Sequence, residues 1–393
     1  MPVALNKTIE TLPVSVSMQF HNNARAMKAA DPTLIDLSAG EPDFDTPAPV
    51  LSEGIAALRA GETRYAVAQG LPALRETVAK KLQTENGCRY APEEILITPG
   101  SKFALYLALR TLVSPGDRVL YPVPAYVSYG PMILAAGGIP VPVELSHTEG
   151  YRLTKERLKA AFSAGAKAVL INYPNNPTGN ILTDEEACLL RDCLLASPGT
   201  AVICDEIYEK IVFDKKKSVS MAAFPELYDR AVTVNGFSKT FSMTGWRAGY
   251  LAAPAYMLRA ALKLQQHSVI SVPPFTQLAA LKALSVPEET ERMRAVYEAR
   301  RNRFIGALNA IPGVSCSLPE GAFYAWVRFP GYSLPSDAMA DYILKAARVV
   351  SVPGNAYGTE DGAVRFCFAR EEAVLAEAAE RIKAALGSLP VSV

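Results

Sequence analysis

Lys239 and Arg247, a lysine and an arginine eight positions apart, are the residues of this chain best suited to chemistry. They belong to the stretch Ser-Lys-Thr-Phe-Ser-Met-Thr-Gly-Trp-Arg, which begins at Ser238. A lysine amine condenses with an aldehyde to a Schiff base when its surroundings suppress its charge. The planar guanidinium of an arginine matches the oxygens of a phosphate. A lysine taken alone is more often a solvated surface cation, but an aldehyde and a phosphate together describe pyridoxal 5′-phosphate (PLP).

A carboxylate at the end of an apolar run is the second candidate. Asp205 follows the run 202–204 and stands three residues before Tyr208. Burying a carboxylate is costly unless it meets a cation. A protonated pyridine nitrogen would supply that cation, and the pair would make the ring an electron sink. Tyr208 would then donate a hydrogen bond to the phenolate oxygen of the ring. On its own, Asp205 is more often the cap of a helix that follows the strand.

Two turn-forming stretches add further polar groups. Residues 173–179, Tyr-Pro-Asn-Asn-Pro-Thr-Gly, are rich in turn formers, and we predict a cis peptide bond at Asn176–Pro177. Ser101 follows Gly100 where a helix is expected to begin, and the free N–H groups and dipole of a helix start favour a phosphate. A Gly-Ser pair in this position is usually only a cap, so this second signal is weak by itself.

Short apolar runs separated by amphipathic ones must position these residues. Strands are expected over 95–98, 118–121, 168–172, 201–205, 231–235 and 249–252, and a helix over 101–113. Apolar runs without alternation indicate a sheet that helices cover on both faces, and intervening helices make it mainly parallel. Ligands of such sheets gather at the carboxyl ends of the strands. The sequence thus predicts an α/β fold in which Gly100, Asn172–Asn176 and Asp205 converge.

The pattern changes after about Leu284. A long charged helix is expected over 287–308, followed by strand-rich segments over 314–328 and 349–368 and a final helix from Glu371. We predict three segments: residues 1–45, which join the small domain; residues 46–284, the large PLP-binding domain; and residues 285–393, the small C-terminal α+β domain.

Composition argues against several classes of function. The 393 residues carry 40 basic and 39 acidic side chains, so nothing favours nucleic acid or an anionic membrane as a partner. No apolar run approaches the about 20 residues that span a bilayer, and the first eleven residues lack the pattern of a secretory signal. Three histidines and six cysteines show no metal-ligand spacing. We therefore expect no metal, reduced cysteines with Cys204 as a buried thiol, and a cytoplasmic location.

The stretch from Ser238 to Arg247 resembles the lysine signature of class I aminotransferases, and Asn176–Gly179 resembles their Asn-Pro-Thr-Gly element. Further similar elements cover nearly the whole chain: 39–47, 64–66, 70–75, 321–324, 352–354 and 364–366. Their order is that of the subgroup of bacterial-type and plastid aspartate and prephenate aminotransferases. The resemblance implies PLP fold type I, a three-layer α/β sandwich with a mainly parallel sheet plus a smaller α+β domain. It also implies a homodimer in which both subunits build each active site.

The resemblance assigns roles at the cofactor ring. Lys239 would form the Schiff base, and Asp205 would pair with the ring nitrogen. Tyr208 and Asn176 would hold the ring oxygen. The ring would stack on Tyr126, for which packing in the core is the alternative.

Further matching residues would bind the phosphate and the substrate. The phosphate would be held by Arg247, Ser101, the Lys102 backbone and Ser238, with Tyr65 reaching the phosphate of the neighbouring subunit. Gly236 stands where some class I members carry a phosphate-binding serine, so that contact is either missing here or replaced by Ser238. Arg365 would clamp the substrate α-carboxylate, with help from the Gly40 backbone and with Asn176 beside it.

The resemblance implies an L-amino acid donor and a 2-oxo acid acceptor that react in a ping-pong sequence. We expect aspartate and 2-oxoglutarate. Lys102 matches a subgroup position that contacts a distal carboxylate, although an ordinary surface lysine is the equal alternative. Met18, Gln19 and Phe20, together with Phe103, depart from the usual pattern and would widen the pocket toward aromatic or prephenate-type substrates.

Two other classes of function are alternatives. A PLP-dependent C–S β-lyase shares the fold and the Lys239, Asp205 and Tyr208 set, and would release pyruvate without an added 2-oxo acid. A non-catalytic regulator would need a DNA-binding module, and the residues before Asp31 are too few and not basic.

Overall fold

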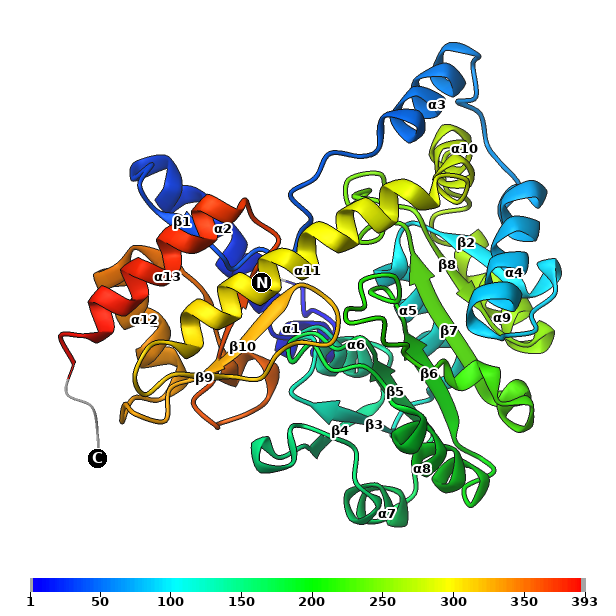
Figure 1. Cartoon of the computed structure of the whole chain (residues 1–393). Coiled ribbons are helices and arrows are strands. Elements are labelled where there is room, and N and C mark those ends of the chain that lie inside the picture. Colours follow the sequence, from blue (N-terminus) through cyan, green and yellow to red (C-terminus); the bar gives the residue numbers. More distant parts are fainter. Residues whose placement is uncertain (1–2, 390–393) are drawn as a thin grey trace.

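The larger part of the molecule is built around a seven-stranded sheet (Figure 1). The computed structural model describes residues 3–389, with only the backbone described for residues 17, 18 and 21. The strand order is β2-β8-β7-β6-β5-β3-β4. The strands are β2 (Ile95–Thr98), β3 (Arg118–Val123), β4 (Ile139–Glu144), β5 (Ala168–Asn172), β6 (Ala201–Asp205), β7 (Ala231–Gly236) and β8 (Gly249–Ala252). β3 to β7 pair in parallel, and β8 runs antiparallel to β2 and β7. The predicted α/β fold with a mainly parallel sheet is confirmed.

The strand boundaries follow the sequence closely, but β3 and β7 end later than predicted, β7 at Gly236 instead of Asn235, and β4 was not predicted. β2, β5, β6 and β8 have the predicted bounds, but β3 continues through Pro122 to Val123 instead of ending at Tyr121. β3 pairs with β5 only at Val119 and Leu120, whereas it pairs with β4 along its whole length. Pro122 has no N–H to donate to a neighbouring strand. It is tolerated here because this part of β3 does not pair with β5.

Helices cover both faces of this sheet, which makes three layers. One face packs against α5 (Ser101–Leu112), α6 (Tyr129–Ala135) and α9 (Ala255–Gln266). The other face packs against α3 (Ala48–Arg59), α4 (Pro72–Asn86), α7 (Lys155–Ser163), α8 (Asp184–Leu195) and α10 (Pro274–Ala283). Successive strand residues point to opposite faces, so Val202 and Ile203 lie in different cores.

A second, antiparallel sheet follows α11 (Pro287–Asn309), the long helix that crosses the middle of Figure 1. Its order is β12-β13-β10-β9, with β9 (Ser315–Cys316), β10 (Tyr324–Arg328), β12 (Val352–Pro353) and β13 (Val364–Cys367). α11, α12 (Ser336–Ala347) and α13 (Glu372–Leu386) pack with it in one core. Near the N-terminus, α1 (Lys7–Thr11) and α2 (Val16–Ala30) precede β1 (Ile35–Asp36), which pairs with β11 (Val349–Val350).

Three findings on residues 3–389 concern possible ligands and partners. No helix there is both long and apolar enough to cross a membrane. No group of three histidine, cysteine or acidic side chains in this range is arranged to hold a metal ion. All six cysteines are unpaired thiols, and Cys204 is buried as predicted, which raises the pKa of its thiol.

Candidate active site

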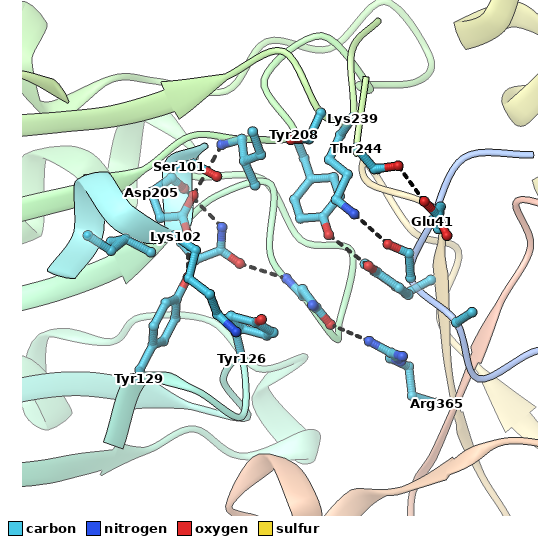
Figure 2. Close-up of a pocket in the computed structure, with 18 of the residues that line it drawn as sticks. Glu41, Ser101, Lys102, Tyr126, Tyr129, Asp205, Tyr208, Lys239, Thr244 and Arg365 are labelled. Carbon is cyan, nitrogen blue, oxygen red and sulfur yellow. Dashed lines mark hydrogen bonds between the residues drawn. The ribbon is translucent and has the colours of Figure 1, made fainter. Parts of the chain in front are cut away.

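The predicted site residues converge on one cavity of about 390 Å³ (Figure 2). Its walls come from the carboxyl ends of β5 and β6, from the start of α5, and from β10 and β13 of the smaller sheet. The predicted residues that line it are Gly40, Ser101, Lys102, Tyr126, Asn176, Asp205, Tyr208, Ser238, Lys239, Arg247 and Arg365. Tyr65 is the exception: it is 86% exposed and does not line the cavity of its own chain.

Lys239 lies in the turns that follow β7. Its Nζ donates a hydrogen bond to the Gly40 carbonyl oxygen and lies 5.9 Å from the centre of the Phe323 ring. Burial lowers the pKa of Lys239 to about 8, because the charged form loses hydration. The amine therefore gives up its proton more readily than a surface lysine does, as a nucleophilic lysine must.

Asp205 ends β6 and faces the cavity. Its carboxylate accepts hydrogen bonds from the Tyr129 hydroxyl at 2.8 Å and from the Ile207 N–H at 3.3 Å. Burial nevertheless raises the pKa of Asp205 to about 6. Turns, and no helix, follow β6, so the helix-cap alternative for Asp205 is wrong. The geometry leaves a buried carboxylate to which a cation in the cavity would be a favourable partner.

Tyr208 forms a hydrogen-bonded pair with Tyr324, the first residue of β10. Their hydroxyl oxygens are 2.7 Å apart, and the rings meet edge-on with centroids 5.7 Å apart. Both side chains are buried, and burial raises both phenol pKa values. Both hydroxyls therefore keep their protons at neutral pH.

Arg365 joins the two sheets at the cavity. It lies on β13, and its Nη1 donates to the Asn176 Oδ1 at 3.0 Å, while its Nη2 donates to the Ser38 carbonyl oxygen at 2.5 Å. Its Nε is buried and has no hydrogen-bond partner among the described residues. Asn176 follows β5, and the bond Asn176–Pro177 is cis as predicted. The arrangement leaves a guanidinium donor unsatisfied beside the cavity.

The start of α5 meets Arg247 in the wall of the cavity. The N-cap of α5 is Gly100, with a φ of 82°, and no side chain caps the first N–H groups. A Cβ at Gly100 would lie 2.4 Å from Nη2 of Arg247, so only glycine lets the guanidinium approach this closely. Arg247 is held by a 2.9 Å hydrogen bond from its Nη1 to the Thr244 carbonyl. Free helix N–H groups beside a guanidinium fit a phosphate.

Gly236 marks a place where the backbone leaves no room for a side chain. A Cβ at Gly236 would lie 2.9 Å from the Cα of Gly249 in the neighbouring strand and 3.0 Å from the Ala248 carbonyl oxygen. A serine would not fit here without a shift of the backbone. Ser238, two residues on, lines the cavity instead.

Lys102 and Tyr126 lie on the opposite side of the cavity from Arg365 (Figure 2). The Nζ of Lys102 is 5.6 Å from the centre of the Tyr126 ring, and the Lys102 side chain is exposed. The Tyr126 ring packs edge-on against Tyr129, with 5.5 Å between centroids. An aromatic face and an ammonium group thus border the same space.

Several residues of the cavity were missed from the sequence. Tyr129, Tyr324 and Ser38 all line it. Asn172, which was expected to converge with Asp205 but was given no role, also lines it and donates from its Nδ2 to the Asp205 carbonyl at 2.9 Å. Tyr324 lies inside a stretch that resembles the family, which was the available signal. Nothing in the sequence indicated that its hydroxyl would meet that of Tyr208.

The residues expected to widen the pocket lie in different places. The side chain of Met18 lies outside the described part of the chain. Phe20 packs beside the small buried cluster around Trp326. Phe103 lines a neighbouring apolar groove that shares Lys102 and Arg247 with the cavity.

Comparisons with known proteins agree with this geometry. The family model described as aminotransferase class I and II matches residues 32–382. Aspartate aminotransferase of Geobacillus stearothermophilus is 40% identical over 96% of this chain and 98% of that protein. Aspartate/prephenate aminotransferase of Cereibacter sphaeroides is 37% identical over 97% of this chain and 98% of that protein. The structure of aspartate aminotransferase from Thermus thermophilus with maleate superposes with a TM-score of 0.93 at 33% identity, covering 98% of this chain and 100% of that one.

Proposed function

The chain belongs to the class I and II aminotransferases, and we propose that it uses PLP to move the amino group of an L-amino acid, aspartate by preference, to 2-oxoglutarate. One observation carries the proposal. A partly buried lysine, a buried carboxylate and a helix start beside an arginine all line a single cavity. Relatives named aspartate aminotransferase support aspartate as the donor.

The cavity offers a matching group for each part of PLP. Lys239 would bond to the aldehyde carbon, Asp205 would pair with the ring nitrogen, and the start of α5 with Arg247 would hold the phosphate. Tyr208 and Asn176 would hold the ring oxygen. When bound, PLP supplies a carbon that accepts amines and a ring that withdraws electrons from the substrate Cα.

The residues of the chain would then bind the substrate and move its proton. Arg365, which lines the cavity, would grip the α-carboxylate in a bidentate way. Lys239, once its amine is free, would take the proton from the Cα of the amino acid. Lys102 would contact the distal carboxylate of a dicarboxylic substrate.

We also propose a homodimer, because apolar side chains of one face of α3 stay exposed in the single chain. Leu51, Ile55 and Leu58 are 45%, 40% and 45% exposed. Tyr65 and Val67, in the loop that follows, are 86% and 58% exposed. A second copy of the chain would cover this surface, and Tyr65 would reach the phosphate site of that copy.

A specific observation favours aromatic or prephenate-type substrates as the second candidate. An apolar groove of about 480 Å³, lined by Phe103, Tyr106 and Met132 among others, adjoins Lys102. A relative named aspartate/prephenate aminotransferase agrees with this alternative.

Lys239→Ala tests the proposed chemistry. We expect a loss of turnover of at least about a thousandfold, since the amine that would take the substrate proton is removed. The unfolding midpoint should stay close to that of the unaltered protein, and Lys345→Ala, an exposed change on α12, serves as the control. Half-reaction rates of Lys239→Ala near those of the unaltered protein would refute the assignment.

Lys102→Ala tests the preference for aspartate. We expect KM for aspartate to rise about tenfold, because a charged contact to the distal carboxylate is lost, while KM for alanine and phenylalanine stays constant. Unchanged selectivity would exclude the distal-carboxylate role. The same assays without a 2-oxo acid would reveal pyruvate if the protein were a β-lyase.

A further inference from the structure

Tyr324 contacts three residues that the proposed function uses. Its hydroxyl lies 2.7 Å from that of Tyr208, and its ring centre is 4.4 Å from the guanidinium carbon of Arg365. A Cβ at Gly40 would lie 2.3 Å from its hydroxyl oxygen, so glycine at position 40 makes room for the Tyr324 hydroxyl. The residue thus lies between the group that would hold the cofactor ring oxygen and the group that would hold the substrate carboxylate.

The two phenols share one hydrogen bond, and its direction matters. If Tyr324 donates to Tyr208, the hydrogen of Tyr208 is free to point into the cavity. If Tyr208 donates to Tyr324, the hydrogen of Tyr208 is engaged in that bond and does not point into the cavity. Both phenols stay protonated, because burial raises their pKa values. An anionic ring oxygen in the cavity accepts hydrogen bonds only, and it therefore favours the first arrangement.

We propose that Tyr324 is a positioning residue that donates to Tyr208 and so directs the Tyr208 proton to the cofactor ring oxygen, an inference that rests on the proposed function. Hydrogen bonds in a chain polarise one another, so the Tyr208 hydroxyl becomes a stronger donor. The Tyr324 ring also lies against Arg365, where a cation–π contact helps to fix the guanidinium.

Tyr324→Phe removes the hydroxyl and keeps the ring against Arg365. In the apo-protein titrated with PLP, we expect the dissociation constant to rise about threefold, which is the size of one modest hydrogen bond. In the protein with bound PLP, the visible absorbance of PLP should change with pH, and the midpoint of this change should rise by roughly half a pH unit. The reason is that a ring oxygen with a weaker hydrogen-bond donor keeps more negative charge. The proton on the neighbouring Schiff-base nitrogen is then held more tightly.

A double-mutant cycle with Tyr208→Phe makes the test specific. If Tyr324 acts through Tyr208, Tyr324→Phe changes neither quantity once the Tyr208 hydroxyl is gone. Tyr332→Phe is the matched control, since it removes the hydroxyl of another buried tyrosine, which donates to the Pro312 carbonyl at 3.0 Å.

The outcomes separate the two claims. If the unaltered protein takes up no PLP, the proposed function and this inference both fail. If Tyr208→Phe shifts both quantities and Tyr324→Phe shifts neither, or if the two effects simply add, only the inference fails. If the effects of Tyr208→Phe and Tyr324→Phe are not additive, and Tyr332→Phe changes neither quantity, the role of Tyr324 as a positioning residue is established.

Discussion

Burial shifts the pKa values of Asp205 and Lys239 toward each other, to about 6 and about 8. In both cases the main cause is that the charged form loses hydration. Between these two values Asp205 is ionised, while much of Lys239 is still protonated. Near neutral pH the cavity therefore holds a carboxylate that would gain from a cationic ring nitrogen.

Under the proposed function, Asp205 should make PLP binding depend on pH. Because its pKa is raised to about 6, Asp205 is protonated below that pH and loses its attraction for a protonated pyridine nitrogen. We expect PLP affinity to fall as pH drops through about 6, and Asp205→Asn to bind PLP about tenfold to a hundredfold more weakly at pH 7.5, without this fall. Fluorescence titrations of the apo-protein at pH 5 and pH 7.5 measure both effects.

The control for this experiment is Asp192→Asn, which removes an exposed carboxylate from α8. It should bind PLP like the unaltered protein at each pH. An Asp205→Asn protein with full affinity at pH 7.5 would contradict the proposed ion pair.

At the scale of elements, β8 passes unusually close to the start of α5. A Cβ at Gly249 would lie 2.4 Å from the Ser101 backbone nitrogen and 2.5 Å from the Gly100 carbonyl carbon. The glycine lets a strand support the helix end whose N–H groups would bind phosphate. β8 also runs antiparallel to its neighbours, which the sequence did not indicate, because apolar runs look the same in either direction.

Gly249→Ala tests this contact. The added methyl group has to push the start of α5 away, so we expect a loss of about 2 kcal/mol in the free energy of unfolding and weaker PLP binding. Denaturant unfolding and PLP titration measure the two quantities. Gly199→Ala is the control, since a Cβ there meets nothing within 4 Å. If the two variants have equal free energies of unfolding, α5 moves away from β8 without loss of stability.

At the scale of the whole molecule, the cavity exists because two sheets meet. Asn176 follows a strand of the seven-stranded sheet, and Arg365 lies on a strand of the four-stranded sheet. The exposed apolar face of α3 and the position of Tyr65 outside the cavity suggest that the functional unit is larger still.

Ile55→Glu tests the dimer. A charge on the exposed face of α3 would be costly to bury, so we expect light scattering to show a shift from twice the mass of one chain toward a single mass. PLP affinity should also fall, because Tyr65 would no longer reach the partner site. Leu195→Glu, on α8 with a similar exposure of 42%, should change neither property. If the unaltered protein is a monomer in solution, the proposed homodimer is wrong.

The sequence by itself determined six of the seven strands of the large sheet, its mainly parallel arrangement and many residues of the cavity. These depend on local signals: apolar runs, turn formers at 173–179, and the lysine stretch from Ser238. The contacts of Tyr208 with Tyr324 and of Asn176 with Arg365, and the close approach of Gly249 to α5, were decided only by the tertiary structure. Each joins residues far apart in the chain, so it depends on how the sheets pack, and no local pattern of residue types encodes that geometry.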